Sequence, residues 1–523
     1  MAEYRLTLVD TAGIQEYIFG SNNLAQNIGA SELVSLATRD WVFEELGDMP
    51  HNGIRRHSGP GWDMVDKSIA THGLDAEVVY AGGGNAVVLF SDKGKQAEFV
   101  KRLTRRVLKD APGLEVVIES IPLEWEANDL AQKLGALRQV VGSKATRPPA
   151  SVPLLGLGVT ATCDYTALPV YGARRSPDGI EQAISRPVAC KLDATERGKE
   201  RLHALLPDDH QDYEFVYDFD QFGTPGESSY IAVIHADGNR MGERFRTLPA
   251  SNNADYARAL RTFSQSIQTA AQAALRYTVS TLIGAYENGP LGEQVPITDH
   301  RLPFRPIVFG GDDVTCVTDG RLGLTLAAIY LQTLMKLSSK LGDGQPLYSR
   351  AGVAIVKTHY PFSRAYQLAE DLAQAAKSAI QRQEDVALDW HYSTSGAIRE
   401  LDEIRKQEYT SRQGHSLLMR PVRMGTVQEV GWQGWETFLR VTTAFKTDPN
   451  WAGRRNKVKA LRDALRAGPE AVRQFITNYE IRGGLPAIGM EEMQKTGWQT
   501  GGCGYFDAIE AMDLFIDLEG SKQ

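Results

Sequence analysis

The segment PIVFGGDDVTCVT at 306–318 decides the fold expected for this chain. Two apolar runs on either side of a glycine turn are typical of a β-hairpin. SYIAVIHAD at 229–237 is a strand-like segment that ends in Asp237, and a helical pattern at about 253–284 joins it to the hairpin. Further elements are predicted after the hairpin: helix 320–341, strand 348–356, helix 361–382 and strand 386–394.

The same order of elements occurs earlier in the chain. YRLTLVD at 4–10 is a strand that ends in Asp10, and VVYAGGGNAVVLF at 78–90 reads as strand, glycine turn and strand. Asp10 precedes Gly82 by 72 residues, and Asp237 precedes Gly310 by 73. Helical patterns at about 28–46 and 93–110 and a strand at 114–123 complete the first copy.

Because both the hairpin and the strand-end carboxylate coincide, we interpret the two copies as a duplicated α+β unit with a ferredoxin-like core. Palm domains that polymerise nucleotides use this arrangement. Two unrelated mixed domains that share a spacing by chance are the alternative.

The chain is expected to contain four parts. Residues 1–140 form a degenerate palm domain, and residues 141–226 form an irregular connector rich in Pro, Gly and Arg, with a vestigial cysteine region and one helix near 193–206. Residues 227–424 form the catalytic palm domain, and residues 425–523 form a C-terminal helical bundle. The helices expected in this bundle cover 427–446, 452–466, 469–480 and 505–518.

Composition excludes several classes of protein. Of 523 residues, 42% are apolar and 23% charged, which is an ordinary globular balance and excludes a wholly disordered chain. No apolar run approaches the roughly 18–20 residues that span a bilayer, and no secretory leader is evident, so we expect a cytoplasmic protein without membrane contact. The net charge of −8 argues against a general coat for nucleic acid.

Three carboxylates are candidates for catalysis and for metal binding: Asp237, Asp312 and Asp313. If strand 229–236 lies beside the hairpin, they converge at one edge of the sheet and repel one another unless a divalent cation neutralises them. Two such cations can activate a ribose hydroxyl and stabilise a leaving pyrophosphate. Gly310 and Gly311 suit a tight turn that a nucleotide can approach closely. Taken alone, GGDD is more typical of a solvated hairpin turn, whereas its pairing with the strand-end DGNRMG at the matching distance favours the metal site.

Other residues are candidates for binding the nucleotide. Gly238 and Asn239 belong to DGNRMG at 237–242, which opens a helix directly after the strand, and backbone N–H groups at a helix start favour phosphate. Lys377 lies late in the predicted helix 361–382, where it either reaches triphosphate oxygens or caps the helix C-terminus.

The first copy keeps the fold pattern and loses the carboxylates. Gly84 and Asn85 stand where the second copy has Asp312 and Asp313, and Asp10 is left alone. This half is expected to be a pseudo-site that pairs with the active one and holds a second nucleotide, or else a structural platform.

DTAGIQEYIFGSNNLAQNIGAS at 10–31, DGNRMG, GGDD and AEDLAQAAK at 369–377 together resemble the large palm-domain subunit of type III CRISPR effector complexes. The resemblance implies a cyclase that makes cyclic oligoadenylate from ATP with two Mg²⁺ or Mn²⁺ ions. It implies that Asp237 and Asp313 are metal ligands and that Asp312 lies in the same turn. It also implies that Gly310 and Gly311 face the nucleotide and that Lys377 contacts phosphate.

The sequence departs from that family in three ways. It contains no His-Asp dipeptide, so we expect the variant without the HD nuclease domain and no DNase activity. Only Cys163 and Cys190 lie in the connector, so no structural zinc is expected. Asn239 stands where a second carboxylate is often found, which puts the number of metal ions in doubt.

Three functions stay open at this point. The first is a metal-dependent nucleotidyltransferase whose cyclic product signals in antiviral defence. The second is a catalytically weak scaffold subunit of an RNA-guided complex, with guide RNA and other type III subunits as partners; here the basic segment 451–466 contacts RNA or is a solvated face. The third is a diguanylate-type synthase that uses GTP. A homodimer is possible under any of them.

Overall fold

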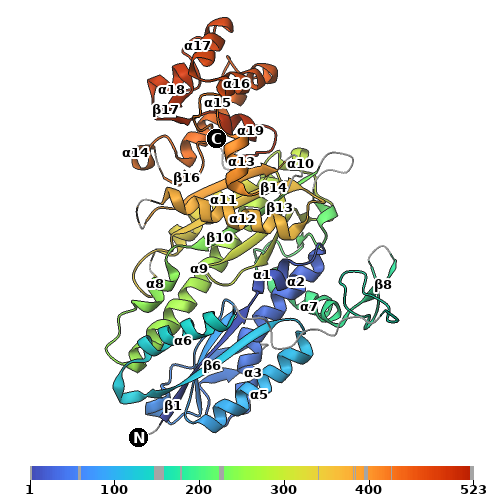
Figure 1. The fold of residues 1–523 in the computed structure, drawn as a ribbon, viewed down its shortest axis with the longest axis vertical. Coiled ribbons are helices and arrows are strands. Elements are labelled where there is room, and N and C mark those ends of the chain that lie inside the picture. Colours follow the sequence, from blue (N-terminus) through green and yellow to red (C-terminus); the bar gives the residue numbers. More distant parts are fainter. Residues whose placement is uncertain are drawn as a thin grey trace.

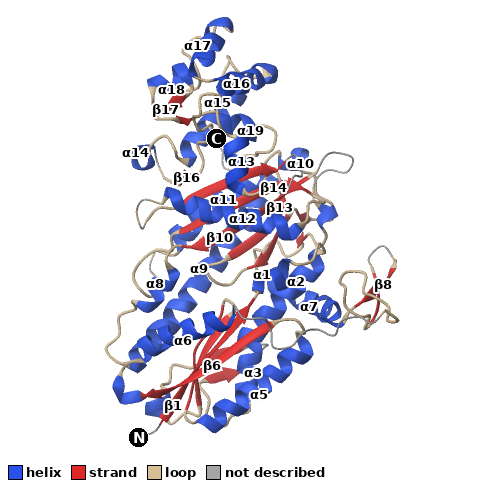
Figure 2. Ribbon diagram, in the orientation of Figure 1, coloured by secondary structure: helices blue, strands red, loops and turns tan. Residues whose placement is uncertain are grey.

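The computed structural model describes residues 3–56, 61–145, 158–176, 179–222, 229–339, 341–380, 382, 384–393, 399–425 and 427–518. The molecule is elongated, with the N-terminal sheet at one end, a second sheet in the middle and the C-terminal helices at the other end (Figure 1). Helices lie beside the strands of both sheets, and the C-terminal end is mostly helical (Figure 2).

The first sheet contains four antiparallel strands in the order β4-β5-β1-β6. This is the order of a ferredoxin-like fold, in which the first strand lies between the third and the fourth. We call this part the N-terminal palm. Its elements are β1 (Glu3–Ala12), α1 (Ile14–Phe19), α2 (Leu24–Ser35), α3 (Trp41–Gly47), β2 (Ile54–Arg56), β3 (Trp62–Met64), α4 (Ile69–His72), β4 (Ala76–Gly82), β5 (Asn85–Phe90), α5 (Lys93–Asp110), β6 (Glu115–Glu124) and α6 (Leu130–Ala145).

The second sheet contains six strands in the order β12-β13-β10-β14-β15-β16, and its first four repeat the order of the N-terminal sheet. The duplicated α+β unit predicted from the sequence is therefore confirmed. We call this part the second palm. Its main elements are β10 (Tyr230–Gly238), α8 (Met241–Arg246), α9 (Asn253–Asn288), α10 (Leu291–Gln294), β12 (Phe304–Val308), β13 (Val314–Asp319), α11 (Gly323–Leu337), β14 (Ser349–Lys357), α12 (Phe362–Ala376), β15 (Ala387–Ser393), α13 (Leu401–Glu408) and β16 (Val422–Arg423).

Helices cover both faces of the second sheet. Along β10, Ile231 and Val233 lie in an apolar cluster with residues of α12, whereas Ala232 and Ile234 lie in a second cluster with residues of α9 and α11. This is the two-residue alternation of a strand that is buried on both faces. The burial fixes β10, and with it Asp237, near the middle of the sheet.

The connector contains a small hairpin and a long helix. They are β7 (Gly172–Arg175), β8 (Glu181–Ile184) and α7 (Arg186–His203), followed by β9 (Glu214–Phe215), which pairs with β11 (Arg301–Leu302). Helix α7 packs closely on α2, since a Cβ added at Gly198 would lie 2.8 Å from the Ile28 side chain. Cys163 is buried in a small cluster with Ile184 and Val188, whereas Cys190 packs against the N-terminal palm.

The C-terminal part is helical, as predicted. It contains α14 (Val427–Val430), α15 (Trp435–Thr447), α16 (Arg455–Ala467), α17 (Pro469–Asn478), α18 (Glu491–Thr496) and α19 (Phe506–Ala511), with a two-stranded ribbon of β17 (Trp498–Gln499) and β18 (Gly502–Cys503). In the basic segment 451–466, proposed as an RNA contact, one lysine makes its contact within the protein. Lys457 is buried, and its Nζ donates to the Asn450 carbonyl 2.9 Å away.

No helix within the described part of the chain is both long enough and apolar enough to cross a bilayer.

Candidate active site

Three carboxylates meet at one end of the central strands of the second sheet. Asp237 lies near the end of β10, and Asp312 and Asp313 lie in the turn between β12 and β13. Ala236 pairs with Val314 in the antiparallel ladder, which places Asp237 beside Asp313 just beyond the paired residues. One oxygen from each of the three carboxylates lies within 4.8 Å of the other two. Among the described residues, this is the one group of three His, Cys, Asp or Glu side chains close enough to share a metal ion.

The glycines around these carboxylates are required by the geometry. Gly310 has a φ of +123°, which a residue with a side chain rarely adopts. A Cβ added at Gly238 would lie 2.7 Å from the Met241 Cγ and 2.9 Å from the Asp312 Cβ. Gly238 therefore lets β10 pass directly beside Asp312.

The carboxylates are hard to ionise together. Burial raises the pKa of Asp312 to about 6, and the charge of Asp237 adds to this effect. Asp313 has an exposed side chain, yet protein atoms crowd its carboxyl group; this desolvation, together with the charges of Asp312 and Asp237, raises the pKa of Asp313 well above its usual value. Because a divalent cation stabilises all three ionised forms, the cluster has the electrostatic character of a metal site.

Arg350 supplies a cation to the cluster. It lies on β14 directly opposite Asp237 in the antiparallel register, and its guanidinium forms an ion pair with that carboxylate. Its Nη1 also donates to Asn239 Oδ1 at 3.2 Å. Sequence reasoning missed this residue. The signal available was an arginine next to the apolar run at 351–356, which gains meaning only once β14 is placed beside β10.

Asn239 is held on three sides. Its Nδ2 donates to the Asp385 carbonyl at 3.1 Å, its backbone N–H donates to the Tyr348 carbonyl at 2.8 Å, and its Oδ1 accepts from Arg350. The side chain is buried and its amide is engaged at both ends. The contact with phosphate expected from the sequence stays a prediction.

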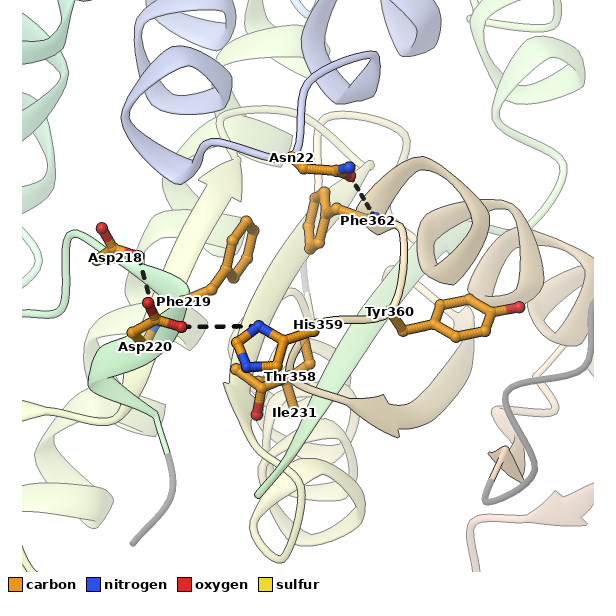
Figure 3. A pocket seen from close by; sticks show the side chains of 9 residues that line it. All are labelled: Asn22, Asp218, Phe219, Asp220, Ile231, Thr358, His359, Tyr360 and Phe362. Carbon is orange, nitrogen blue, oxygen red and sulfur yellow. Dashed lines mark hydrogen bonds and ion pairs between the residues drawn. The ribbon is translucent and has the colours of Figure 1, made fainter. Parts of the chain in front are cut away.

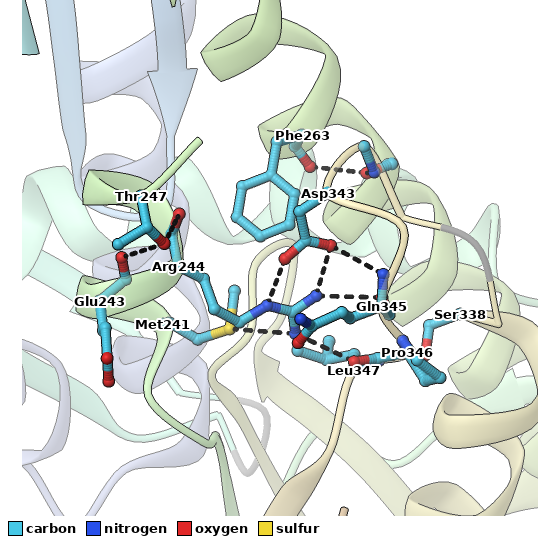
Figure 4. A network of polar contacts seen from close by, with 12 residues as sticks. Met241, Glu243, Arg244, Thr247, Phe263, Ser338, Asp343, Gln345, Pro346 and Leu347 are labelled. Carbon is cyan, nitrogen blue, oxygen red and sulfur yellow. Dashed lines mark hydrogen bonds and ion pairs between the residues drawn. The ribbon is translucent and has the colours of Figure 1, made fainter. Parts of the chain in front are cut away.

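The helix predicted after the strand is the short helix α8, and a buried arginine ties it to the loop before β14. Arg244 makes a bidentate ion pair with Asp343, with both nitrogen–oxygen distances at 2.7 Å, and donates to the carbonyls of Gln345 and Pro346 at 3.0 Å (Figure 4). The guanidinium also lies over the ring of Phe263. These contacts fix the segment that carries Gly238 and Asn239, and they occupy the guanidinium of Arg244.

Lys377 is exposed and follows the last residue of α12. Strands β14 and β15 run parallel, and Ala387 of β15 pairs with Arg350. The crossover through α12 therefore returns the chain to the end of the strands where Asp237 lies. The structure places Lys377 on this side of the sheet but outside the carboxylate cluster.

The glycine turn of the N-terminal palm faces the turn that carries Asp312 and Asp313. A Cβ added at Gly311 would lie 3.8 Å from the Gly83 Cα. Nearby, Gln15 of α1 donates to Glu370 of α12 at 2.8 Å, and the ring of Phe19 stacks on that of Tyr366 with centroids 4.0 Å apart. The segment at 10–31 therefore lies against the second palm, next to the candidate site.

The position in the first copy that corresponds to the acidic cluster has a different chemistry. Asn85 accepts a hydrogen bond from the Tyr80 hydroxyl, which in turn accepts from Arg138 at 3.3 Å. Burial raises the pKa of Asp10 despite the charge of Arg138. A carboxylate alone in this position does not form a multidentate metal site.

A separate pocket of about 230 Å³ lies at the opposite end of β10 and β14, where Ile231 and Thr358 form part of its lining (Figure 3). Asp218 and Asp220 also line it, and their charge disfavours a triphosphate. Six residues of extended strand, roughly 20 Å, separate Ile231 from Asp237. This pocket is therefore distinct from the carboxylate cluster.

Residues 230–386 match the family model of the second palm domain of Cas10/Cmr2. No curated protein sequence matches the chain. Csm1 of T. onnurineus superposes with a TM-score of 0.53 at 15% identity, over 99% of this chain and 70% of that one. Chains from Csm1–Csm4 cassettes in complex with cA3 and with AMPPNP give TM-scores of 0.54 and 0.53 at 13% and 14% identity, over 98% of this chain and 69% of theirs.

At these identities the solved structures show the fold alone. The shared fold covers 98–99% of this chain and 69–70% of the solved chains. Two palm domains and a helical C-terminal part, as expected from the sequence, are confirmed. The family resemblance is confirmed by the match to residues 230–386, which include the three carboxylates and Arg350. The chain therefore shares the fold of Csm1, and its residues 230–386 match the model of the second palm domain of Cas10/Cmr2.

Proposed function

We propose that this chain is a metal-dependent nucleotidyltransferase that makes cyclic oligoadenylate from ATP and releases pyrophosphate, as a signal in type III CRISPR defence against viruses. The observation that carries the proposal is the convergence of Asp237, Asp312 and Asp313 within 4.8 Å at the end of a palm-type sheet. The similarity to Csm1–Csm4 cassettes that bind AMPPNP and cA3 supports the choice of an adenine nucleotide.

The donor set fits Mg²⁺ or Mn²⁺, because hard divalent cations prefer carboxylate oxygens. A divalent ion held by these carboxylates supplies Lewis-acid stabilisation of a ribose hydroxylate and of the leaving pyrophosphate. The protein holds the three oxygens on two different elements, β10 and the β12–β13 turn, so that the cluster depends on the sheet being formed.

The neighbouring residues keep space for the nucleotide and orient it. Gly310 and Gly311 present backbone without side chains on the side that faces the N-terminal palm. The backbone from Gly238 to Asn239 leads into α8, where N–H groups favour phosphate. Lys377 is exposed on the side of the sheet where these strands end, and it is the candidate for a contact with the triphosphate.

We assign the N-terminal palm to residues 1–140. Its turn around Gly83 faces the site. We propose that this domain binds the second nucleotide in each joining step. The catalytic palm is assigned to 227–424, between a connector at 141–226 and a helical domain at 425–523. Other type III subunits with their guide RNA are the proposed partners.

The test is the reaction itself. The purified chain, alone and with an RNA-loaded partner complex, is incubated with labelled ATP or GTP and Mn²⁺, and the products are resolved by mass spectrometry. We expect pyrophosphate and a cyclic product from ATP. Asp313→Asn should lower the rate about a thousandfold, corresponding to about 4 kcal/mol of lost charge stabilisation in the transition state.

Asp463→Asn, an exposed position on α16, is the matched control and should retain full activity. No pyrophosphate release in either setting contradicts the proposal. Product from GTP alone supports the diguanylate-type alternative.

A further inference from the structure

Arg350 is built into the acidic cluster by the fold. Its backbone pairs with Asp237 in the ladder between β10 and β14, so the two side chains start as direct neighbours in the sheet. Only 12% of its side chain is exposed, against 27% for Asp237. A guanidinium held this way loses most of its freedom to move into solvent.

The contacts of Arg350 are directed into the site. One side of the guanidinium forms the ion pair with Asp237, and Nη1 donates to Asn239 Oδ1. Its Nε is buried and has no hydrogen-bond partner in the described structure. The arginine therefore takes up one oxygen of Asp237 and the amide oxygen of Asn239, two oxygens that would otherwise be free to bind a metal ion.

Two other cations near the site are placed differently. Arg244 is engaged by Asp343 in a bidentate pair, and Lys377 is exposed outside the cluster. In the N-terminal palm, Asp10 pairs with Val117 on the strand that corresponds to β14, so the half without the acidic cluster also has no arginine at this position. The arginine and the carboxylates occur together in the same repeat.

The sum of the charges in the site limits how many divalent ions it can hold. Asp237, Asp312 and Asp313 contribute three negative charges when ionised, and Arg350 contributes one fixed positive charge. One divalent ion brings the sum to zero, whereas two leave a net charge of +2 in a partly buried site, which is unfavourable without further anions.

We propose, on the basis of the function proposed above, that Arg350 is a positioning residue which acts as the permanent cation of the site, so that the nucleotide-free chain holds one divalent ion and not two. The carboxylates share that ion, and the guanidinium neutralises part of the charge of Asp237. A second ion then requires the negative charge of a triphosphate.

The test counts Mn²⁺ bound to the full chain without nucleotide, from the electron paramagnetic resonance signal of free Mn²⁺, with isothermal titration as a second measurement. Wild type should bind one ion per chain, and Asp313→Ala should lose it. Arg350→Gln should bind a second ion at least tenfold more tightly than wild type does. Arg350→Lys, which keeps the charge, should still bind one.

Lys357→Gln is the matched control, because it removes one positive charge at the exposed far end of the same strand and should leave the count at one. Circular dichroism establishes that each variant is folded. Two tight ions in wild type, or one in both wild type and Arg350→Gln, overturn the inference and leave the proposed function standing. No bound ion in wild type, together with no product from ATP, overturns both.

Discussion

At the scale of single residues, Gly238 has no room for a side chain. A methyl group there would lie 2.7 Å from the Met241 Cγ and 2.9 Å from the Asp312 Cβ, so Asp312 must shift. We expect Gly238→Ala to cost about 1–3 kcal/mol of stability through overpacking and to lower Mn²⁺ affinity at least tenfold. Urea unfolding and Mn²⁺ titration measure the two effects.

Gly242→Ala is the control for this change, since a Cβ there meets nothing within 4 Å and lies inside α8. Alanine should stabilise that helix by up to about 1 kcal/mol and leave Mn²⁺ binding unchanged. Unaltered Mn²⁺ affinity in Gly238→Ala contradicts the close approach of β10 to Asp312.

The titration of Asp312 predicts how stability depends on pH. Its pKa is raised to about 6 in the folded chain, against about 4 in an unfolded one, so the folded state binds the proton more tightly. This contribution to stability is complete below pH 4 and is lost as the pH rises through 6. Without metal, the free energy of unfolding should therefore fall by about 1–2 kcal/mol between pH 5 and pH 8 on account of this group.

Urea midpoints at the two pH values measure the change, and Asp312→Asn isolates it because that variant has no proton to lose. Millimolar Mn²⁺ should abolish the fall, since the ion stabilises the ionised carboxylates. An equal fall in wild type and Asp312→Asn shows that other groups cause it.

At the scale of elements, the hairpins and strand ends were predictable from local patterns, whereas the exact register between strands was not. The strand–turn–strand patterns at 78–90 and 306–318 became β4-β5 and β12-β13, because an apolar run on each side of glycines is local information. The predicted helix 28–46 is interrupted by a π-helical stretch at Leu36–Asp40. Helix α6, which contains two glycines, was missed because glycine weakens a helical pattern.

The candidate site shows the same division. Asp237 and the acidic turn stood out because a duplicated spacing linked them, although they are far apart in the sequence. Arg350 did not, since its importance depends on the register that sets it opposite Asp237, and the register between β10 and β14 follows from long-range packing rather than from any local pattern. Residues whose role depends on the register between distant strands are the ones that sequence reasoning misses.

At the scale of the whole molecule, a buried ion pair joins the two palms. Arg261 of α9, 7% exposed, donates to Glu77 of β4, 3% exposed, at 2.9 Å, and also to the Val78 carbonyl at 3.0 Å. Glu77 in turn accepts from the backbone N–H of Ile69. The pair thus links the long helix of the second palm to the strand that leads to the Gly83 turn.

Removing one partner of this pair should cost more than removing both. Glu77→Ala leaves the buried Arg261 guanidinium with only the exposed carboxylate of Asp66, 3.5 Å from its Nη1, and we expect a loss of about 3 kcal/mol in the free energy of unfolding. The combination Glu77→Leu with Arg261→Met leaves no buried charge and should recover most of that loss. Urea unfolding of the variants gives these values.

The ion pair also bears on function, because it helps to hold the Gly83 turn opposite Gly311. If the site uses both palms, Glu77→Ala should slow product formation in conditions where the chain is still folded, whereas the apolar pair should restore it. Arg276→Ala, which removes an exposed arginine of the same helix that pairs with Asp208, is the control and should affect neither stability nor rate by more than a small factor. Additive losses from Glu77→Ala and Arg261→Ala, each below about 0.5 kcal/mol, would show that packing alone holds the palms together.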